Sequence, residues 1–158
     1  RKTTPGLRIF EKYAFKCGGG VNHRMGLYDA AMIKENHIAW TDNLKNAVQN
    51  IRLNSPFTTH IIIEAENIDQ AKEAVLAGAD SVLLDELSPE IIKKNVQELR
   101  DLSINSLQKE VNKNLIIEVS GINPQEISKY LIKGIDLIST SSSITKSDWI
   151  DLSMRYIN

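Results

Sequence analysis

The feature that most constrains this chain is an alternation of short apolar runs with longer amphipathic segments, which continues from residue 30 toward the end. The runs "AAMI", "HIIIEAE", "DSVLLDE", "NLIIEVS" and "IDLIST" have the apolar, mostly β-branched composition of parallel strands that are covered on both faces. A segment with helical periodicity follows each run. The sequence therefore predicts five βα units, arranged as a barrel or as a doubly wound sheet.

Capping residues, prolines and glycines predict where the helices begin and end. The first helix should be capped by Thr4 and should stop at Gly18, with Phe10, Tyr13 and Cys17 on a buried apolar stripe. Residues 103–114 either extend the preceding helix or form a loop. A C-terminal helix should follow "IDLIST". The other expected boundaries are caps at Thr41, Ser88 and Asn123 and stops at Gly78 and Gly134.

A length of 158 residues fits one domain but is short for a complete eight-unit barrel. The chain begins on "RKTTPG" without methionine, so we expect residues 1–158 to be one α/β domain of a longer protein. The formal net charge of -1 argues against a broad nucleic-acid footprint. No apolar run reaches the roughly 20 residues of a membrane helix. With one cysteine and no signal peptide, the expected location is the cytoplasm.

Polar residues end or closely follow the predicted strands. In a βα barrel these positions converge on one face, where active sites are built, whereas an open doubly wound sheet would line them along an edge. Their positions favour the barrel, and the length of the chain makes an incomplete barrel the expectation. The residues concerned are Lys34, Glu64, Asp85, Ser120 and Ser139.

Five cationic or potentially cationic residues, Arg1, Lys2, His23, Arg24 and Lys34, flank the first helix and strand. Arginine matches a carboxylate or phosphate with two parallel hydrogen bonds, and lysine adds a point charge. Together they are expected to hold a small dianion. The "CGGG" run lacks the spacing of a nucleotide-binding loop and is expected to end the first helix. His37 and His60 are expected to be structural.

Glu64 and Asp85 are expected to do more than neutralise Lys34, although both roles are compatible. Carboxylates in this position can ligate Mg²⁺, accept hydrogen bonds from ribose hydroxyls or stabilise positive charge on a sugar carbon. The segments "SGIN" and "STSSS" place backbone N–H groups and hydroxyls after the last two strands. Barrels frequently bind phosphate there.

The segments "RKTTPGLR", "CGGGVNHRMGLYDAAMIKENH", "IIIEAEN", "SVLLDE", "EVSGIN" and "IDLIST" resemble the nicotinate-nucleotide pyrophosphorylases, also called quinolinate phosphoribosyltransferases. The resemblance implies an open α/β barrel that makes nicotinate mononucleotide, pyrophosphate and carbon dioxide from quinolinate and phosphoribosyl pyrophosphate with Mg²⁺, in NAD biosynthesis. It also implies homo-oligomers in which each site borrows an arginine from the partner's N-terminal domain. That domain is absent from these 158 residues.

The resemblance also implies roles for individual residues. Quinolinate carries two adjacent carboxylates, which the cationic set would clamp. Lys34, Glu64 and Asp85 would be catalytic, and Glu64 and Asp85 are also the candidates for holding Mg²⁺. The implied quinolinate-binding residues are Arg1, Lys2, His23, Arg24 and Lys34. The implied phosphoribosyl- and phosphate-binding residues are Lys2, Glu64, Asp85, Ser120, Gly121, Ser139 and Ser141.

Three residues depart from the family pattern: Glu86 replaces the usual Asn, Ile122 the second glycine of "SGG", and Ser141 the glycine of "ISxG". They weaken the expectation for the phosphate loop in particular. Three alternatives remain. One is the related molybdenum-transport-associated pyrophosphorylase, which Lys34 argues against. The others are a barrel metallohydrolase, for which no histidine pair has ligand spacing, and a module that binds phosphate or dicarboxylate without turnover.

Overall fold

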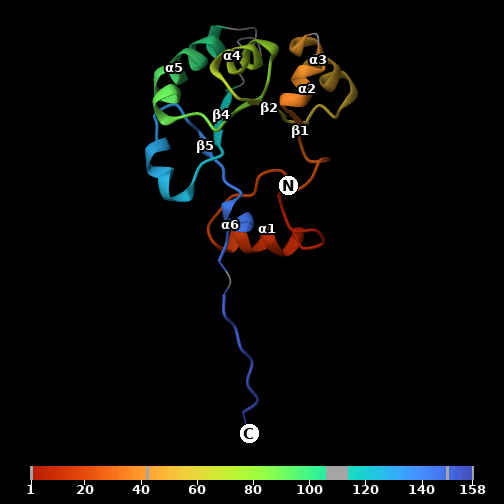
Figure 1. The fold of residues 1–158 in the computed structure, drawn as a ribbon. Coiled ribbons are helices and arrows are strands. Elements are labelled where there is room, and N and C mark those ends of the chain that lie inside the picture. Colours follow the sequence, from red (N-terminus) through yellow and green to blue (C-terminus); the bar gives the residue numbers. More distant parts are fainter. Residues whose placement is uncertain (1, 42, 106–113, 149, 158) are drawn as a thin grey trace.

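The computed structural model describes residues 2–41, 43–105, 114–148 and 150–157. Its centre is a five-stranded parallel sheet with the order β1-β2-β3-β4-β5 (Figure 1). This order follows the chain, whereas a doubly wound sheet reverses direction at a switch point. The open-barrel prediction is therefore confirmed. The strands are β1 (Ala31–Ile33), β2 (Ile61–Ala65), β3 (Ser81–Asp85), β4 (Ile116–Ser120) and β5 (Leu137–Ile138).

Helices that follow the strands form a layer on one face of the sheet (Figure 1). The strand side chains on this face, such as Ile61, Ile63 and Val82, are fully buried against apolar residues of the helices. Burial of this kind is the main stabilising term of the fold. The elements concerned are α2 (Glu35–Ala39), α3 (Leu44–Asn54), α4 (Ile68–Ala77), α5 (Pro89–Asn105) and the 3₁₀ helix η2 (Pro124–Tyr130).

The opposite face of the sheet is partly polar, and we call it the site face. Its apolar part is a small cluster of Ala30, Ile62 and Leu83, against which Met32 packs. Because successive side chains of a strand point to opposite faces, every second residue of each strand lies on the site face. The strand register places Glu64 beside Leu83, and Leu83 beside Glu118, on this face.

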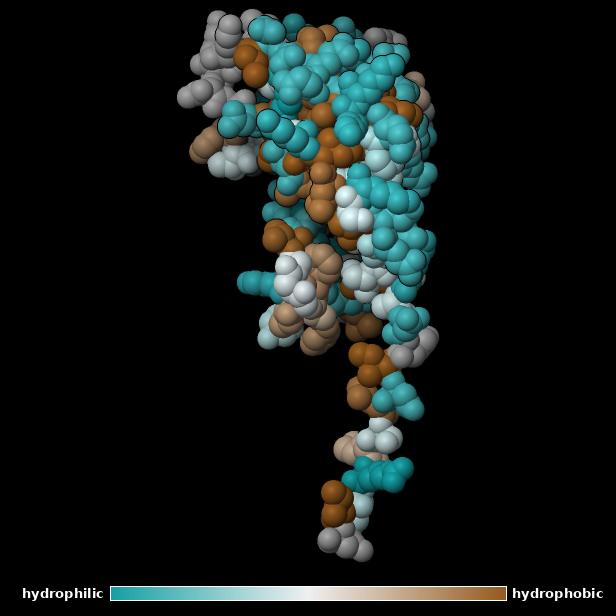
Figure 2. All heavy atoms as spheres, turned by 90° about the vertical axis from the view of Figure 1, so that its left-hand side faces the viewer, coloured by the Kyte–Doolittle hydropathy of each residue, from teal (hydrophilic) through white to brown (hydrophobic). Residues whose placement is uncertain are grey.

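Helices α1 (Arg8–Cys17) and α6 (Ser142–Thr145) lie apart from the helix layer, close to each other (Figure 1). Residues 150–157 extend from there as a tail without helix or strand, and its hydrophobic side chains are exposed (Figure 2). The expected C-terminal helix is thus reduced to the four residues of α6. Within the described ranges, no helix is long and apolar enough to cross a bilayer.

Two helix caps differ from the prediction. Gly6 adopts a positive φ of 79°, so the chain turns before α1 begins at Arg8, and Thr4 is not the cap. The cap of α3 is Asn43, whose side chain accepts a hydrogen bond from the Asn46 N–H at 3.0 Å. Thr41 instead exchanges hydrogen bonds with the backbone of Asn43. The caps at Ser88 and Asn123 and the stop at Gly78 are confirmed.

Other differences concern length and burial. Cys17 is exposed, as are Phe10 and Tyr13, so the prediction that this stripe lies in the core is wrong. Nothing among the described residues covers that side of α1. The segment after Asn123 forms the 3₁₀ helix η2, which ends at Tyr130 and not at Gly134. The short helix α2 was not expected. Helix α5 extends to Asn105, and residues 106–113 lie outside the described ranges.

Candidate active site on the open face of the sheet

Lys34 and Glu64 form an ion pair where β1 and β2 end. The Lys34 Nζ lies 2.6 Å from Glu64 Oε2 and 2.7 Å from Oε1. Lys34 is the last residue before α2, and Glu64 is buried in β2. Glu64 therefore neutralises Lys34 in the absence of ligand. The Lys34 side chain is only half-buried, so its ammonium remains accessible from solvent.

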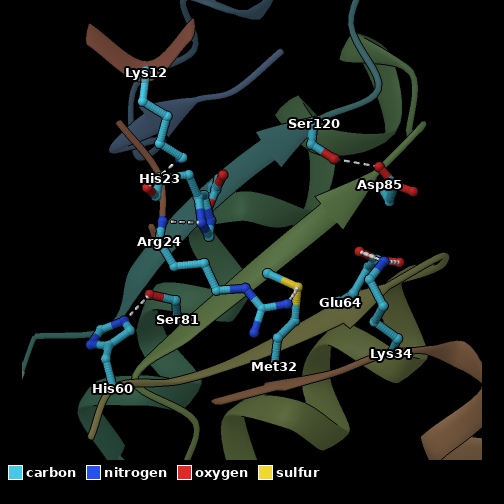
Figure 3. A network of polar contacts seen from close by, with 11 residues as sticks. Lys12, His23, Arg24, Met32, Lys34, His60, Glu64, Ser81, Asp85 and Ser120 are labelled. Carbon is cyan, nitrogen blue, oxygen red and sulfur yellow. Dashed lines mark hydrogen bonds and ion pairs between the residues drawn. The ribbon is translucent and has the colours of Figure 1, made fainter. Parts of the chain in front are cut away.

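Asp85 and Ser120 lie side by side at the ends of β3 and β4, where the strand register pairs them. The Ser120 hydroxyl donates a hydrogen bond to Asp85 Oδ1. Asp85 follows Leu83 by two residues and so points to the same face as Glu64. Figure 3 shows Lys34, Glu64, Asp85 and Ser120 grouped on one side of the site face. The convergence of these strand-end residues was predicted from the sequence.

His23 and Arg24 reach the other side of the site face from the segment after α1 (Figure 3). The Arg24 guanidinium donates to the Ala30 carbonyl oxygen at 2.8 Å and contacts Met32 Sδ at 3.5 Å, which anchors it beside β1. His23 Nδ1 accepts a hydrogen bond from the Arg24 N–H at 2.8 Å. That nitrogen is therefore unprotonated, and in the neutral ring the proton sits on Nε2.

Glu118 was missed by the sequence analysis. It is 2% exposed in the middle of β4, and its Oε2 lies 3.4 Å from His23 Nε2. Its Oε1 has no hydrogen-bond partner among the described residues. The contact orients the imidazole and accounts for the direction of Nε2. A single charge inside the apolar run "IIEVS", two residues before Ser120, was the available signal.

A cavity of about 150 Å³ lies between α1, the segment 21–23 and residues 138–144. It brings together Lys2, His23, Ser139 and Ser141, all of them predicted site residues from distant parts of the sequence. Lys12 of α1 also lines it and was not predicted. Arg1, the remaining member of the cationic set, lies outside the described residues.

The structure accommodates Ile122 and Ser141, two of the departures from the family pattern, and gives no reason for the third, Glu86. Glu86 is exposed and has φ 55°, a left-handed conformation that asparagine adopts more readily. Its backbone packs closely on Gly121, where an added Cβ would lie 2.6 Å from Glu86 Cγ. Ile122 is buried in the main core, away from solvent. Ser141 has φ -97°, which does not require glycine.

The other two histidines have structural contacts, as predicted. His37 Nδ1 accepts from the Lys34 N–H at 3.0 Å within the first turn of α2. His60 Nε2 lies 2.6 Å from the Ser81 hydroxyl, at the opposite end of the strands from Asp85. No group of three histidine, cysteine, aspartate or glutamate side chains that could hold a metal ion occurs in the described part of the chain.

Comparison with known proteins identifies relatives of one kind. The probable carboxylating nicotinate-nucleotide pyrophosphorylase of Methanothermobacter thermautotrophicus is 43% identical over 156 residues, covering 98% of this chain and 53% of the relative. The carboxylating nicotinate-nucleotide pyrophosphorylase of Homo sapiens is 31% identical over 156 residues, covering 98% of this chain and 50% of the relative. This chain thus spans about half the length of the curated relatives it matches.

Solved structures agree. The nicotinate-nucleotide pyrophosphorylase from Francisella tularensis superposes with a TM-score of 0.76 at 38% identity, covering 97% of this chain and 50% of that one. NadC from Streptococcus pyogenes superposes with a TM-score of 0.75 at 38% identity, covering 92% of this chain and 47% of that one. A model of the quinolinate phosphoribosyl transferase C-terminal domain matches residues 1–155. With this match over almost its whole length, the chain belongs to the quinolinate phosphoribosyl transferase C-terminal domain family.

Proposed function

We propose that the protein containing this chain transfers a phosphoribosyl group from phosphoribosyl pyrophosphate to quinolinate, with decarboxylation, to give nicotinate mononucleotide, pyrophosphate and carbon dioxide in NAD biosynthesis. One observation carries the proposal: the ends of β1 to β4 bring a lysine and two carboxylates to the site face, and Arg24 reaches the same face from its other side, as this chemistry requires. Family membership supports it. The activity is proposed for the whole protein, of which these residues form the proposed catalytic α/β domain.

Quinolinate is proposed to bind between Arg24 and Lys34. Its adjacent carboxylates form a rigid dianion, and each cation is held from its own element, Arg24 through the Ala30 carbonyl and Lys34 at the end of β1. Fixed cations bind a planar dianion with little loss of side-chain entropy. Arg1, Lys2 and His23 are proposed to complete this clamp. The clamp favours quinolinate over nicotinate, which has one carboxylate.

Glu64 and Asp85 are proposed to lie near the ribose. As pyrophosphate departs, the sugar carbon gains positive charge, and carboxylates on the site face stabilise it while the pyridine nitrogen attacks. When quinolinate takes Lys34 as its partner, Glu64 is released for this role. The bond to the 2-carboxylate then breaks, carbon dioxide leaves, and the ring carbon takes up a proton from solvent. Ser120, Gly121, Ser139 and Ser141 are proposed to bind the phosphate groups of the substrate.

The two carboxylates also fit Mg²⁺. Magnesium is usually held by one or two protein carboxylates together with water and substrate phosphates, and it does not need three protein ligands. Glu64 and Asp85 lie on the same face and supply oxygen ligands of the correct kind. Bound Mg²⁺ would neutralise the charge on the departing pyrophosphate. A cytoplasmic homodimer or larger homo-oligomer is proposed from the family resemblance.

The test is titration of quinolinate and nicotinate into the full-length protein, with Arg24→Ala and the exposed-lysine control Lys45→Ala. Loss of a charged hydrogen bond costs about 1.5–3 kcal/mol, so Arg24→Ala should weaken quinolinate binding by roughly 10- to 100-fold. Lys45→Ala should leave it unchanged. Equal affinity for quinolinate and nicotinate, or an Arg24→Ala variant that binds like the wild type, contradicts the dianion clamp. Turnover is tested by measuring the release of pyrophosphate when quinolinate, phosphoribosyl pyrophosphate and Mg²⁺ are all present.

A further inference from the structure

Lys12 is the one buried residue of α1, at 7% exposure, although apolar residues of the same helix are exposed. Its Nζ donates a hydrogen bond to the His23 carbonyl oxygen at 3.0 Å (Figure 3). The Lys12 carbonyl accepts in turn from Asn22 Nδ2 at 2.9 Å. Among the described residues, Lys12 has no carboxylate partner in an ion pair. A lysine is thus buried against a neutral oxygen.

Two carboxylates near Lys12, those of Glu11 and Asp29, accept hydrogen bonds from backbone N–H groups. Glu11 accepts a hydrogen bond from the Thr4 N–H at 2.8 Å. Asp29 accepts one from the Met25 N–H at 2.8 Å. Burial lowers the pKa of Lys12, and the positive charge of Arg8 lowers it further, while Asp29 opposes the change. A buried ammonium with incomplete charge compensation is costly and is stabilised by an anion.

The Lys12 side chain lines the cavity of about 150 Å³ described above. The neighbouring polar groups there include the ammonium of Lys2 and the hydroxyls of Ser139 and Ser141, all of which can donate hydrogen bonds. Ammonium and hydroxyl donors converging on a small cavity suit a phosphate group, which offers several charged acceptor oxygens. Glu11 also borders the cavity and carries the opposing charge.

We propose that Lys12 binds a phosphate group of the phosphoribosyl substrate in this cavity. Through the His23 carbonyl, the same ammonium also fixes the backbone that carries Arg24. The charge of Lys12 thus serves phosphate binding, and its N–H donor holds the backbone of the dianion clamp. This inference rests on the proposed function and adds a residue to it. The phosphate is either the 5-phosphate or the pyrophosphate of the substrate, and the two are separated by experiment.

The experiment uses three variants of the full-length protein. Lys12→Gln removes the charge but keeps an N–H donor for the His23 carbonyl, and Lys12→Arg keeps both. Lys16→Gln removes an exposed charge from the same helix and is the control. The probes are ribose 5-phosphate, inorganic pyrophosphate and quinolinate, each titrated by calorimetry. Urea unfolding verifies that every variant is folded.

The expected result is that Lys12→Gln binds one phosphate probe about tenfold more weakly, the loss of one charged contact, and binds quinolinate as the wild type does. The probe affected identifies the phosphate. Lys12→Arg should retain most of the affinity, and Lys16→Gln all of it. Unchanged binding of both phosphate probes overturns the proposal. So does a parallel loss of quinolinate binding, which would assign Lys12 a purely structural role. If the wild type binds no substrate, the proposed function itself fails.

Discussion

The helix-covered side of the sheet and the α1 region carry similar amphipathic patterns but bury them very differently. Ile61 and Ile63 of β2 are 0% exposed, whereas Phe10 and Tyr13 of α1 are 70% and 69% exposed. In the sheet, each βα unit brings its own helix to cover its strand. The stripe on α1 has no such cover among the described residues. Periodicity thus indicates that a helix forms, but its burial depends on a matching surface.

The largest expected effect comes from truncating a matched pair of apolar residues. Ile63→Ala should lower the free energy of unfolding by about 2–5 kcal/mol because it opens a cavity under the helices. Phe10→Ala should change it by less than about 1 kcal/mol, since little of its surface is removed from water. Urea unfolding measures both. A cost for Phe10→Ala as large as that for Ile63→Ala would mean that the α1 stripe is packed in solution.

A second pair compares a glycine of the helix layer with a glycine at the strand ends of the site face. Gly78 ends α4 at φ 90° with no atom within 4 Å of an added Cβ, whereas at Gly121, φ 74°, the Cβ would meet Glu86. Gly78→Ala should cost about 1–2 kcal/mol for the left-handed backbone alone. Gly121→Ala should cost about 1 kcal/mol more because Glu86 must move. An equal loss of unfolding free energy in the two variants would show that Glu86 moves away from residue 121 at no cost.

The sequence predicted what is local and missed what depends on distant contacts. The strand runs, the stop at Gly78 and the meeting of Lys34 with Glu64 follow from spacing and from the geometry of parallel strands. Cys17 was misassigned because burial depends on a covering surface. Lys12 and Glu118 were missed because charged residues are ordinarily solvated, and only the tertiary contact with His23 shows them to be buried.

A smaller effect is expected at Glu86, which bears the left-handed conformation without being glycine. Glu86→Asn should raise the free energy of unfolding by roughly 0.5–1 kcal/mol, because asparagine adopts this conformation at lower cost. Urea unfolding measures the gain, and Glu73→Asn, at an exposed helical position of α4, is the control. A loss of stability would mean that the glutamate side chain makes a stabilising contact in solution.

The smallest effect concerns the pH dependence of stability. Burial lowers the pKa of Lys12 below its ordinary value of 10.5. Between the folded-state pKa and 10.5, the unfolded chain binds more protons, so this residue makes stability rise with pH across that window. Below the folded-state pKa, Lys12 is protonated in both the folded and the unfolded chain, so it no longer makes stability depend on pH. Lys12→Met should flatten the rise, measured as the urea midpoint from neutral pH to 10.5, and an unchanged slope would contradict the prediction.

The strand order has a consequence for how the protein is assembled during synthesis. Each strand pairs with the strand made just before it, so the sheet can grow in the direction of translation. No strand must wait for a distant segment, which keeps the loops that close each pairing short and their entropic cost low. The cavity beside α1 is different, because α1 can reach residues 138–144 only after the last strand of the described sheet has emerged. The sheet can therefore form before this cavity exists.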